Sequence, residues 1–169
     1  MTSDSSHPAA GMVLGALPAE RLATVAVCER DEVVAVVVQN DSVRYVVLVE
    51  WREKEWVVPS LINGTGRPAT GPPRPATTQD PVTLPELTFT QSGWPAPDGD
   101  RPEFAWCAVT GGVARDAREV VLTSEVDEVC TAVRSDGFVL GVVKARWHIR
   151  PEVAVRTSAG HLVVDGRPS

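Results

Sequence analysis

The sequence predicts an all-β protein, an antiparallel β-sandwich built from two strand-rich halves that a proline-rich connector joins. Valine-rich, strand-patterned runs fill both halves, and proline is concentrated between them. The halves span about 50 and about 65 residues, sizes at which an isolated core is marginal, so co-packing is expected. We therefore expect one domain over 12–169, preceded by a disordered leader over 1–11.

In the first half, the leader is rich in Ser, Thr and Ala without periodicity, and structure is expected to begin near Met12. Strands are expected over 23–28, 33–39 and 42–50, separated by the charged segment 29–32 and by the turn residues Asn40 and Asp41. The run 42–50 is apolar on both faces, which favours a central strand. Its two faces carry Val43, Tyr45, Val47 and Val49 on one side, and Arg44, Val46 and Leu48 on the other.

Trp51 and Trp56 flank the charged run Arg52–Glu55. This arrangement predicts a hairpin turn whose aromatic rings close one end of the sandwich. An alternative places a helix over Pro18–Val27, because Pro18-Ala19-Glu20-Arg21 is typical of a helical first turn. That alternative makes the first half α+β.

Residues 65–102 form the connector, which holds nine of the fourteen prolines. Proline removes a ladder donor and biases its predecessor toward an extended conformation, so no central strand is expected over 65–80. The alternating run Glu86–Gln91 predicts an added strand. Strands return at 104–110, 118–123, 129–134, 138–144, 151–156 and 162–164, and Asp136-Gly137 is the strongest hairpin signal.

The three cysteines, Cys28, Cys107 and Cys130, lie in apolar runs and match no zinc or CxxC spacing. We expect buried free thiols, with one disulfide across the sandwich as the alternative for an exported chain. A net charge of -6 argues against a nucleic-acid or anionic-membrane binder. The longest apolar run, Val33–Val38, is far shorter than the ~20 residues of a membrane span. A cytoplasmic location is expected, with an exported or envelope-associated one as the alternative.

The second half resembles a known group of proteins through Gly111-Gly112-Val113, Arg118–Leu122 and Ala132–Phe138. These segments are similar to small actinobacterial β-sandwich domains of unknown function. In the first half, Ala35–Val37, Val49–Trp56 and Asn63-Gly64 are similar to the upstream portion of the same group. The resemblance implies a sandwich, sometimes found beside membrane anchors, and implies no catalytic residues.

No arrangement of catalytic residue types is apparent in the sequence, and we expect no enzyme, metal or cofactor. A hydrolase is kept as a third alternative. Its conceivable nucleophiles are Cys130, Cys107 and Ser135, its bases His148 and His161, and its orienting carboxylates Asp136 and Asp165. Neither Asp98-Gly99-Asp100 nor Gly111-Gly112 completes a calcium or phosphate motif.

A local basic cluster carries the preferred hypothesis. Arg134, Lys144, Arg146, Arg150 and Arg156, interrupted by Asp136 and Glu152, give a net charge of +3 around Trp147 and His148. Arginine and tryptophan dominate the energetics of many protein interfaces. We therefore expect a non-enzymatic protein-interaction or accessory domain with an unidentified protein partner. The alternative is a small-molecule or anion-binding domain that uses Arg134, Lys144, Arg146, Trp147, His148 and Arg150. The segment Arg67–Pro75 is a weaker candidate, as an extended ligand for another protein.

Overall fold

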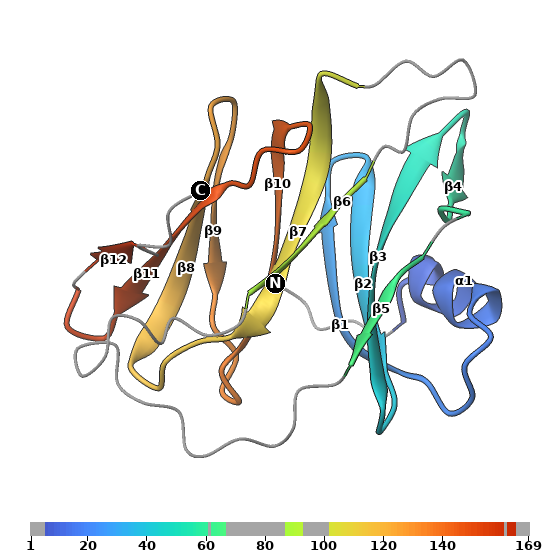
Figure 1. The fold of residues 1–169 in the computed structure, drawn as a ribbon, viewed down its shortest axis with the longest axis horizontal. Coiled ribbons are helices and arrows are strands. Elements are labelled where there is room, and N and C mark those ends of the chain that lie inside the picture. The colour runs from blue at the N-terminus through green and yellow to red at the C-terminus, as the bar shows by residue number, and fades with distance from the viewer. Residues whose placement is uncertain (1–5, 61, 67–86, 93–101, 161, 165–169) are drawn as a thin grey trace. The chain divides into compact units, whose positions relative to one another are not determined.

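The computed structural model describes residues 6–60, 62–66, 87–92, 102–160 and 162–164. Antiparallel strands make up most of this structure, with one short helix near the N-terminus (Figure 1). The predicted all-β class is therefore confirmed. The chain divides into two compact units, 1–70 and 71–169. The expectation of a single domain over 12–169 stays a prediction.

Unit 1 is a five-stranded antiparallel sheet with a helix on one face (Figure 1). Its strands run in the order β1-β2-β3-β4, and β5 also pairs with β3. The elements are α1 (Pro8–Ala16), β1 (Ala23–Arg30), β2 (Val33–Gln39), β3 (Val43–Arg52), β4 (Glu55–Val57) and β5 (Gly64–Gly66). All six apolar residues of β2 are buried, and β3 pairs on both sides, so the expected central position of β3 is confirmed.

The two predicted turns of unit 1 form, and their residues have the hydrogen bonds and backbone angles that such turns require. The side-chain Oδ1 of Asn40 accepts backbone N–H bonds from Ser42 and Val43, each at 2.9 Å. Glu53 and Lys54 both have positive φ, as a two-residue hairpin turn requires. Trp51 therefore pairs with Trp56 across the hairpin, with ring centroids 5.1 Å apart in an edge-to-face arrangement.

Helix α1 begins at Pro8, so the expected disordered leader is wrong for residues 8–11. The imidazole Nδ1 of His7 accepts the backbone N–H of Ala9 at 3.1 Å and caps the helix, and proline fits its first turn. Val13 is fully buried beneath the helix, and burying such a side chain contributes about 2 kcal/mol. The sequence pattern missed α1 because this helix has no polar face to reveal a helical period.

The alternative helix over Pro18–Val27 is wrong, because β1 starts at Ala23. Arg21, with φ of 58°, interrupts the right-handed helical path just before that strand. The core beneath α1 combines helix and sheet residues from one face. It contains Ala9, Ala10, Val13, Val27, Val34, Val36, Val38, Val47 and Val49, with Tyr45, Trp56, Val58 and Ile62 partly buried beside them.

Unit 2 contains two antiparallel sheets, in the orders β10-β7-β6 and β12-β11-β8-β9 (Figure 1). The strands are β6 (Thr88–Gln91), β7 (Phe104–Gly112), β8 (Ala117–Thr123), β9 (Glu128–Ala132), β10 (Phe138–Arg146), β11 (Glu152–Thr157) and β12 (Leu162–Val164). Every strand predicted in this half is present, including the added strand before Ser92. The rest of the predicted connector, 67–86 and 93–101, lies outside the described residues.

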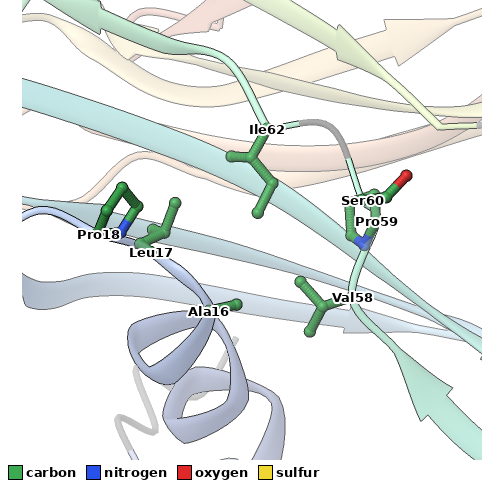
Figure 2. A pocket seen from close by; sticks show the side chains of 7 residues that line it. All are labelled: Ala16, Leu17, Pro18, Val58, Pro59, Ser60 and Ile62. Atoms are coloured by element: carbon green, nitrogen blue, oxygen red, sulfur yellow. The ribbon is translucent and has the colours of Figure 1, made fainter.

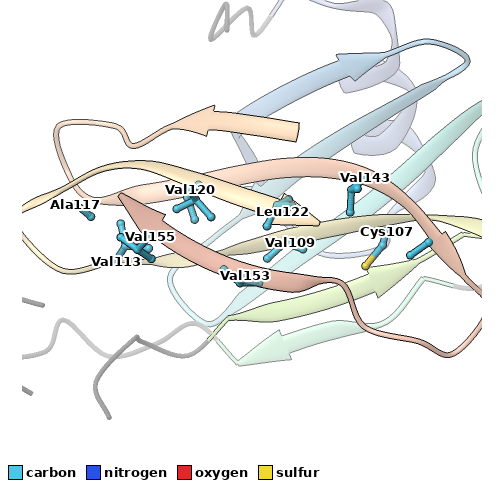
Figure 3. Packing of buried hydrophobic residues seen from close by; sticks show 11 residues of the cluster. Cys107, Val109, Val113, Ala117, Val120, Leu122, Val143, Val153 and Val155 are labelled. Carbon is cyan, nitrogen blue, oxygen red and sulfur yellow. The ribbon is translucent and has the colours of Figure 1, made fainter. Parts of the chain in front are cut away.

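A shared apolar core joins the two sheets of unit 2 (Figure 3). Cys107 and Val109 of β7 and Val143 of β10 face Leu122 of β8 and Val153 of β11 across it. Each of these side chains is at most 2% exposed. This unit is therefore a sandwich of two antiparallel sheets.

The tight turn at Asp136-Gly137 forms, but it does not make the predicted hairpin. Gly137 has φ of 80°, and the Arg134 amide bonds the Phe138 carbonyl at 3.0 Å. The strands on either side then enter different sheets, because β9 pairs with β8 and β10 pairs with β7. Turn residues determine the turn geometry, whereas the core determines which strands pair.

Gly141 lies where β10 passes close to residues of the second sheet. A Cβ atom added to this residue would lie 2.7 Å from Cδ1 of Leu122 and 3.2 Å from Cγ2 of Thr131. Nearby, the Thr131 hydroxyl donates a hydrogen bond to the Leu140 carbonyl at 3.1 Å. Glycine is therefore the residue that allows this close approach.

Candidate functional site

The structure brings together five of the six predicted binding residues at one end of β10. Lys144 and Arg146 are the last outward-facing residues of that strand, and Trp147, His148 and Arg150 follow in the turn before β11. The sixth residue, Arg134, lies beyond the opposite end of β10. There it pairs with Asp136 at 3.0 Å and stacks over the Phe138 ring.

Arg156 is also separate from the cluster. It lies near the end of β11 and pairs with Glu119 of β8 at 3.1 Å. The expected patch of +3 therefore does not exist as one surface. For Arg134 the reason is geometric, because the nine residues of β10 span roughly 30 Å.

A single glutamine holds the turn after β10 in shape. Gln91 of β6 accepts the His148 amide at 3.0 Å through Oε1. Its Nε2 donates to the carbonyls of Arg146 and Ile149, at 3.3 and 3.2 Å. His148 has φ of 64°, a left-handed conformation that is uncommon for a residue other than glycine. These bonds therefore fix a strained turn in one conformation.

Arg146 forms ion pairs with two carboxylates at this end of the sheet. Its guanidinium lies 2.8 Å from a carboxylate oxygen of Glu125 and 3.5 Å from one of Glu103. A hydrogen bond from its own backbone, followed by the bond from Arg146, lowers the pKa of Glu125. A third carboxylate, that of Asp127, accepts the Lys144 amide at 2.7 Å.

Three cations in this region lie over aromatic rings. The distances from the charged group to the ring centroid are 5.5 Å for Lys144 over Trp106, 5.3 Å for Arg146 over Phe104 and 5.0 Å for Arg150 over Phe89. Such contacts at exposed sites contribute about 0.5–1 kcal/mol each. They also limit the freedom of long side chains before any partner binds.

Two exposed aliphatic side chains belong to the turns that bond Arg146. Val126 and Ile149 are each 51% exposed, and they are the large apolar side chains that the described part of unit 2 leaves exposed. Val126 follows the ion-paired Glu125, and the Ile149 amide bonds the Arg146 carbonyl at 2.9 Å. We call the whole group the β10-end surface: Glu103, Glu125, Val126, Arg146, His148, Ile149 and Arg150.

Sequence reasoning missed Val126, Ile149 and the two glutamates of this surface. Ile149 was detectable as a lone apolar residue between His148 and Arg150. Glu103 and Glu125 are 43 and 21 residues from Arg146, so only the fold reveals their pairing. The preferred residue Trp147 is partly buried, with its ring 4.5 Å from that of His148. Its Nε1 is buried and has no hydrogen-bond partner within the described residues.

The structure separates Ser135 from His148, two residues of the hydrolase alternative. Ser135 precedes β10 and His148 follows it, so the two lie roughly 30 Å apart along the strand. Burial raises the pKa of the Cys107 thiol to about 12, against a smaller opposite effect of Arg150. His161 and Asp165 lie outside the described residues.

The thiols differ from the expectation of burial. None of these three cysteines, all of which the structure describes, forms a disulfide, but Cys130 is exposed and Cys28 is partly exposed, whereas Cys107 is buried as predicted. Cys130 lies on β9, which is paired on one side only in the described sheet. Across residues 6–60, 62–66, 87–92 and 102–160, no group of three or more His, Cys, Asp and Glu side chains is placed to hold a metal ion.

A shallow groove of about 320 Å³ lies beside α1 in unit 1 (Figure 2). Ala16, Leu17 and Pro18 form one wall, and the segment after β4 forms the other through Val58, Pro59, Ser60 and Ile62. No ionisable side chain is among these lining residues. The groove therefore offers an uncharged surface.

No helix in the described part of the chain has the length and apolar character to cross a membrane. The resemblance to small actinobacterial β-sandwich domains stays a prediction. The chain matches no protein-family model, no curated protein and no solved structure.

Proposed function

We propose that this chain is a non-catalytic protein-interaction domain that contacts its partner through the β10-end surface. The observation that carries the proposal is that Val126 and Ile149, each 51% exposed, belong to the two turns that bond Arg146, one through the side chain of Glu125 and the other through the Ile149 amide. Apolar side chains around an anchored arginine are the composition of an interface centre. The partner is expected to present an apolar contact with polar groups around it.

Pre-organisation supports the same function. Gln91 fixes the turn that carries His148 and Ile149, and the stacking on Phe104 and Phe89 restrains Arg146 and Arg150. A surface already held in its binding conformation loses less conformational entropy on association. The geometry thus favours binding over a role as a solvated strand end.

The charge balance favours a protein partner over an anionic ligand. Lys144, Arg146 and Arg150 supply three positive charges, and Glu103, Glu125 and Asp127 supply three negative charges in the same region. The local net charge is therefore zero. An anion-binding site requires excess positive charge, which this region lacks.

Site-specific photo-crosslinking tests the proposal in the full chain. With p-benzoylphenylalanine at position 149, irradiation in the source cells should give one crosslinked band of defined mass. The same probe at position 156, whose native arginine pairs with Glu119, is the matched control and should not give that band. Adding Val126→Asp to the position-149 chain should weaken crosslinking roughly tenfold, because it places a charge within the contact.

Identical bands from positions 149 and 156 would contradict the proposal. Crosslinking that persists at full strength with both Val126→Asp and Arg146→Glu would contradict it too. Circular dichroism of each variant establishes that the fold is retained, so that a lost band reports the surface itself.

A further inference from the structure

The chain has two asparagines, and only Asn63 is followed by glycine. Asn63 is exposed and lies directly before β5, which begins at Gly64. In an Asn-Gly pair the backbone nitrogen of the glycine can attack the carbonyl carbon of the asparagine side chain, because glycine has no Cβ atom to obstruct the approach. Asparagine is a thermolabile residue. The attack needs a glycine N–H that no neighbouring strand holds in a hydrogen bond.

Packing against β3 favours glycine at position 64. A Cβ atom added to Gly64 would lie 2.6 Å from Cε1 of Tyr45 and 2.8 Å from Cγ2 of Val43. Side chains approach each other most closely where two antiparallel residues face each other without hydrogen bonds between them. Alanine at this position would have to displace the Tyr45 ring, so the fold retains the Asn-Gly sequence.

The hydrogen bonds of β3 toward β2 follow a strict alternation. The Val43 carbonyl accepts the Asn40 amide at 3.0 Å, and the Trp51 amide donates to the Glu32 carbonyl at 2.7 Å. The register between β2 and β3 is unbroken from one of these pairs to the other. Because alternate residues of a strand direct their backbone groups to opposite sides, the odd-numbered residues of β3 bond toward β2.

The same alternation shows where the Gly64 N–H points. The even-numbered residues of β3 bond away from β2, so Arg44 and Thr65 form the hydrogen-bonded pair between β3 and β5. Gly64 faces Tyr45, one residue out of that pair. Its N–H therefore points away from β3, toward the side on which the described sheet has no further strand.

The other asparagine, Asn40, is held in place. Its Oδ1 accepts the backbone N–H groups of Ser42 and Val43, each at 2.9 Å, and its Nδ2 donates to the Glu20 carbonyl at 3.0 Å. Its side chain cannot turn toward the backbone nitrogen of Asp41 without breaking these three bonds.

We infer that Asn63 is a site of spontaneous deamidation, independent of the β10-end surface. A base in solution removes the Gly64 N–H proton, the nitrogen bonds to Cγ of Asn63, and the Cγ–Nδ2 bond breaks to release ammonia. Water then opens the cyclic imide and leaves aspartate or isoaspartate at position 63. Both products add a negative charge, and isoaspartate also lengthens the backbone by one carbon. Because Gly64 then loses its fit against Tyr45, β5 separates from β3.

Peptide mapping by mass spectrometry of the full chain carrying Asp41→Gly tests the site. This change gives Asn40 the same following residue as Asn63, so the two sites differ in structure and not in dipeptide. In mildly alkaline buffer the folded protein should lose the amide of Asn63 and keep that of Asn40. In urea, where the fold is lost, both amides should be lost at similar rates. Asn63→Gln, with a longer side chain, should keep its amide in both conditions.

Hydrogen exchange tests the effect on β5. In the isoaspartate form of the wild type, the Arg44 amide should exchange faster, whereas the Val47 amide, which bonds toward β2, should not change. Equal loss of the amides of Asn40 and Asn63 in the folded Asp41→Gly chain overturns the inference. It is also overturned if the folded chain keeps the Asn63 amide, or if Arg44 exchange is unaltered by isoaspartate.

Discussion

At the scale of single residues, burial changes the acidity of the Cys107 thiol. Burial raises the pKa of its thiol from 9.0 to about 12. Between these values the folded chain keeps a proton that the unfolded chain releases. The stabilisation that this causes is complete below pH 9 and is lost as the pH rises toward 12.

Replacing Cys107 with alanine should remove this pH dependence. The loss of unfolding free energy in Cys107→Ala relative to wild type should be larger at about pH 8 than at about pH 10.5, measured by urea denaturation. Cys130→Ala, at the exposed cysteine, is the matched control and should show no such change. A Cys107 difference that stays constant over this range would contradict the burial of that thiol.

Individual residues also show why the sequence predicted only some of the residues of the β10-end surface. Arg146 and Trp147 were predicted to belong to one binding region, and the structure places both at the end of β10. The charge of that region was predicted incorrectly, because Glu103 and Glu125 come from other strands and turns. Arg134 was included by its proximity in sequence, although an entire strand separates it from the others.

At the scale of elements, Gly141 sets the distance between β10 and the second sheet. Gly141→Val should lower the free energy of unfolding by about 1–3 kcal/mol, because the new side chain meets the fully buried Leu122. Denaturant unfolding measures this loss. Gly112→Ala is the control, since a Cβ atom on that residue of β7 meets no atom within 4 Å.

A second variant tests the cause of the Gly141 effect. If the clash with Leu122 is responsible, the combination of Gly141→Ala with Leu122→Ala should cost less than the sum of the two single variants. Strict additivity would indicate that backbone conformation, and not side-chain crowding, requires glycine at this position.

Strands were more predictable than the helix for a physical reason. Valine-rich runs on either side of the turn residues Asn40-Asp41 indicated β2 and β3 to within one or two residues at each end. Helix α1 gives no comparable signal, because its outward residues are as apolar as its inward ones. Asp136-Gly137 correctly indicated a turn, but local residues carry no information about the sheet that β10 joins.

At the scale of the whole molecule, the two units differ in how their sheets are connected. In unit 1 the sheet order β1-β2-β3-β4 follows the chain, and each of these strands pairs with its neighbour in sequence. In unit 2 β7 pairs with β10 and β8 pairs with β11, across intervening strands. The all-β class was predictable from composition and pattern, whereas this difference in connection was not.

These connections should set the order in which backbone amides gain protection during refolding. Neighbouring strands close short loops, whereas pairing of β7 with β10 must first close a long one, and non-local pairing slows folding. Pulsed hydrogen exchange should therefore find the amides of β2 and β3 protected before those of β7 and β10. Simultaneous protection, or the reverse order, would contradict this expectation.

The turn at Asp136-Gly137 has a further consequence for a chain that is still being synthesised. Because β10 completes one sheet and β11 completes the other, neither sheet of unit 2 can form fully until the last third of the chain has been made. Until then β7 and β8 lack their long partners, and such unpaired apolar strands are prone to aggregate. The chain passes from one sheet to the other at this turn, and this crossing completes the finished sandwich. During synthesis, the same crossing means that the incomplete second unit must be protected from aggregation until β10 and β11 have been made.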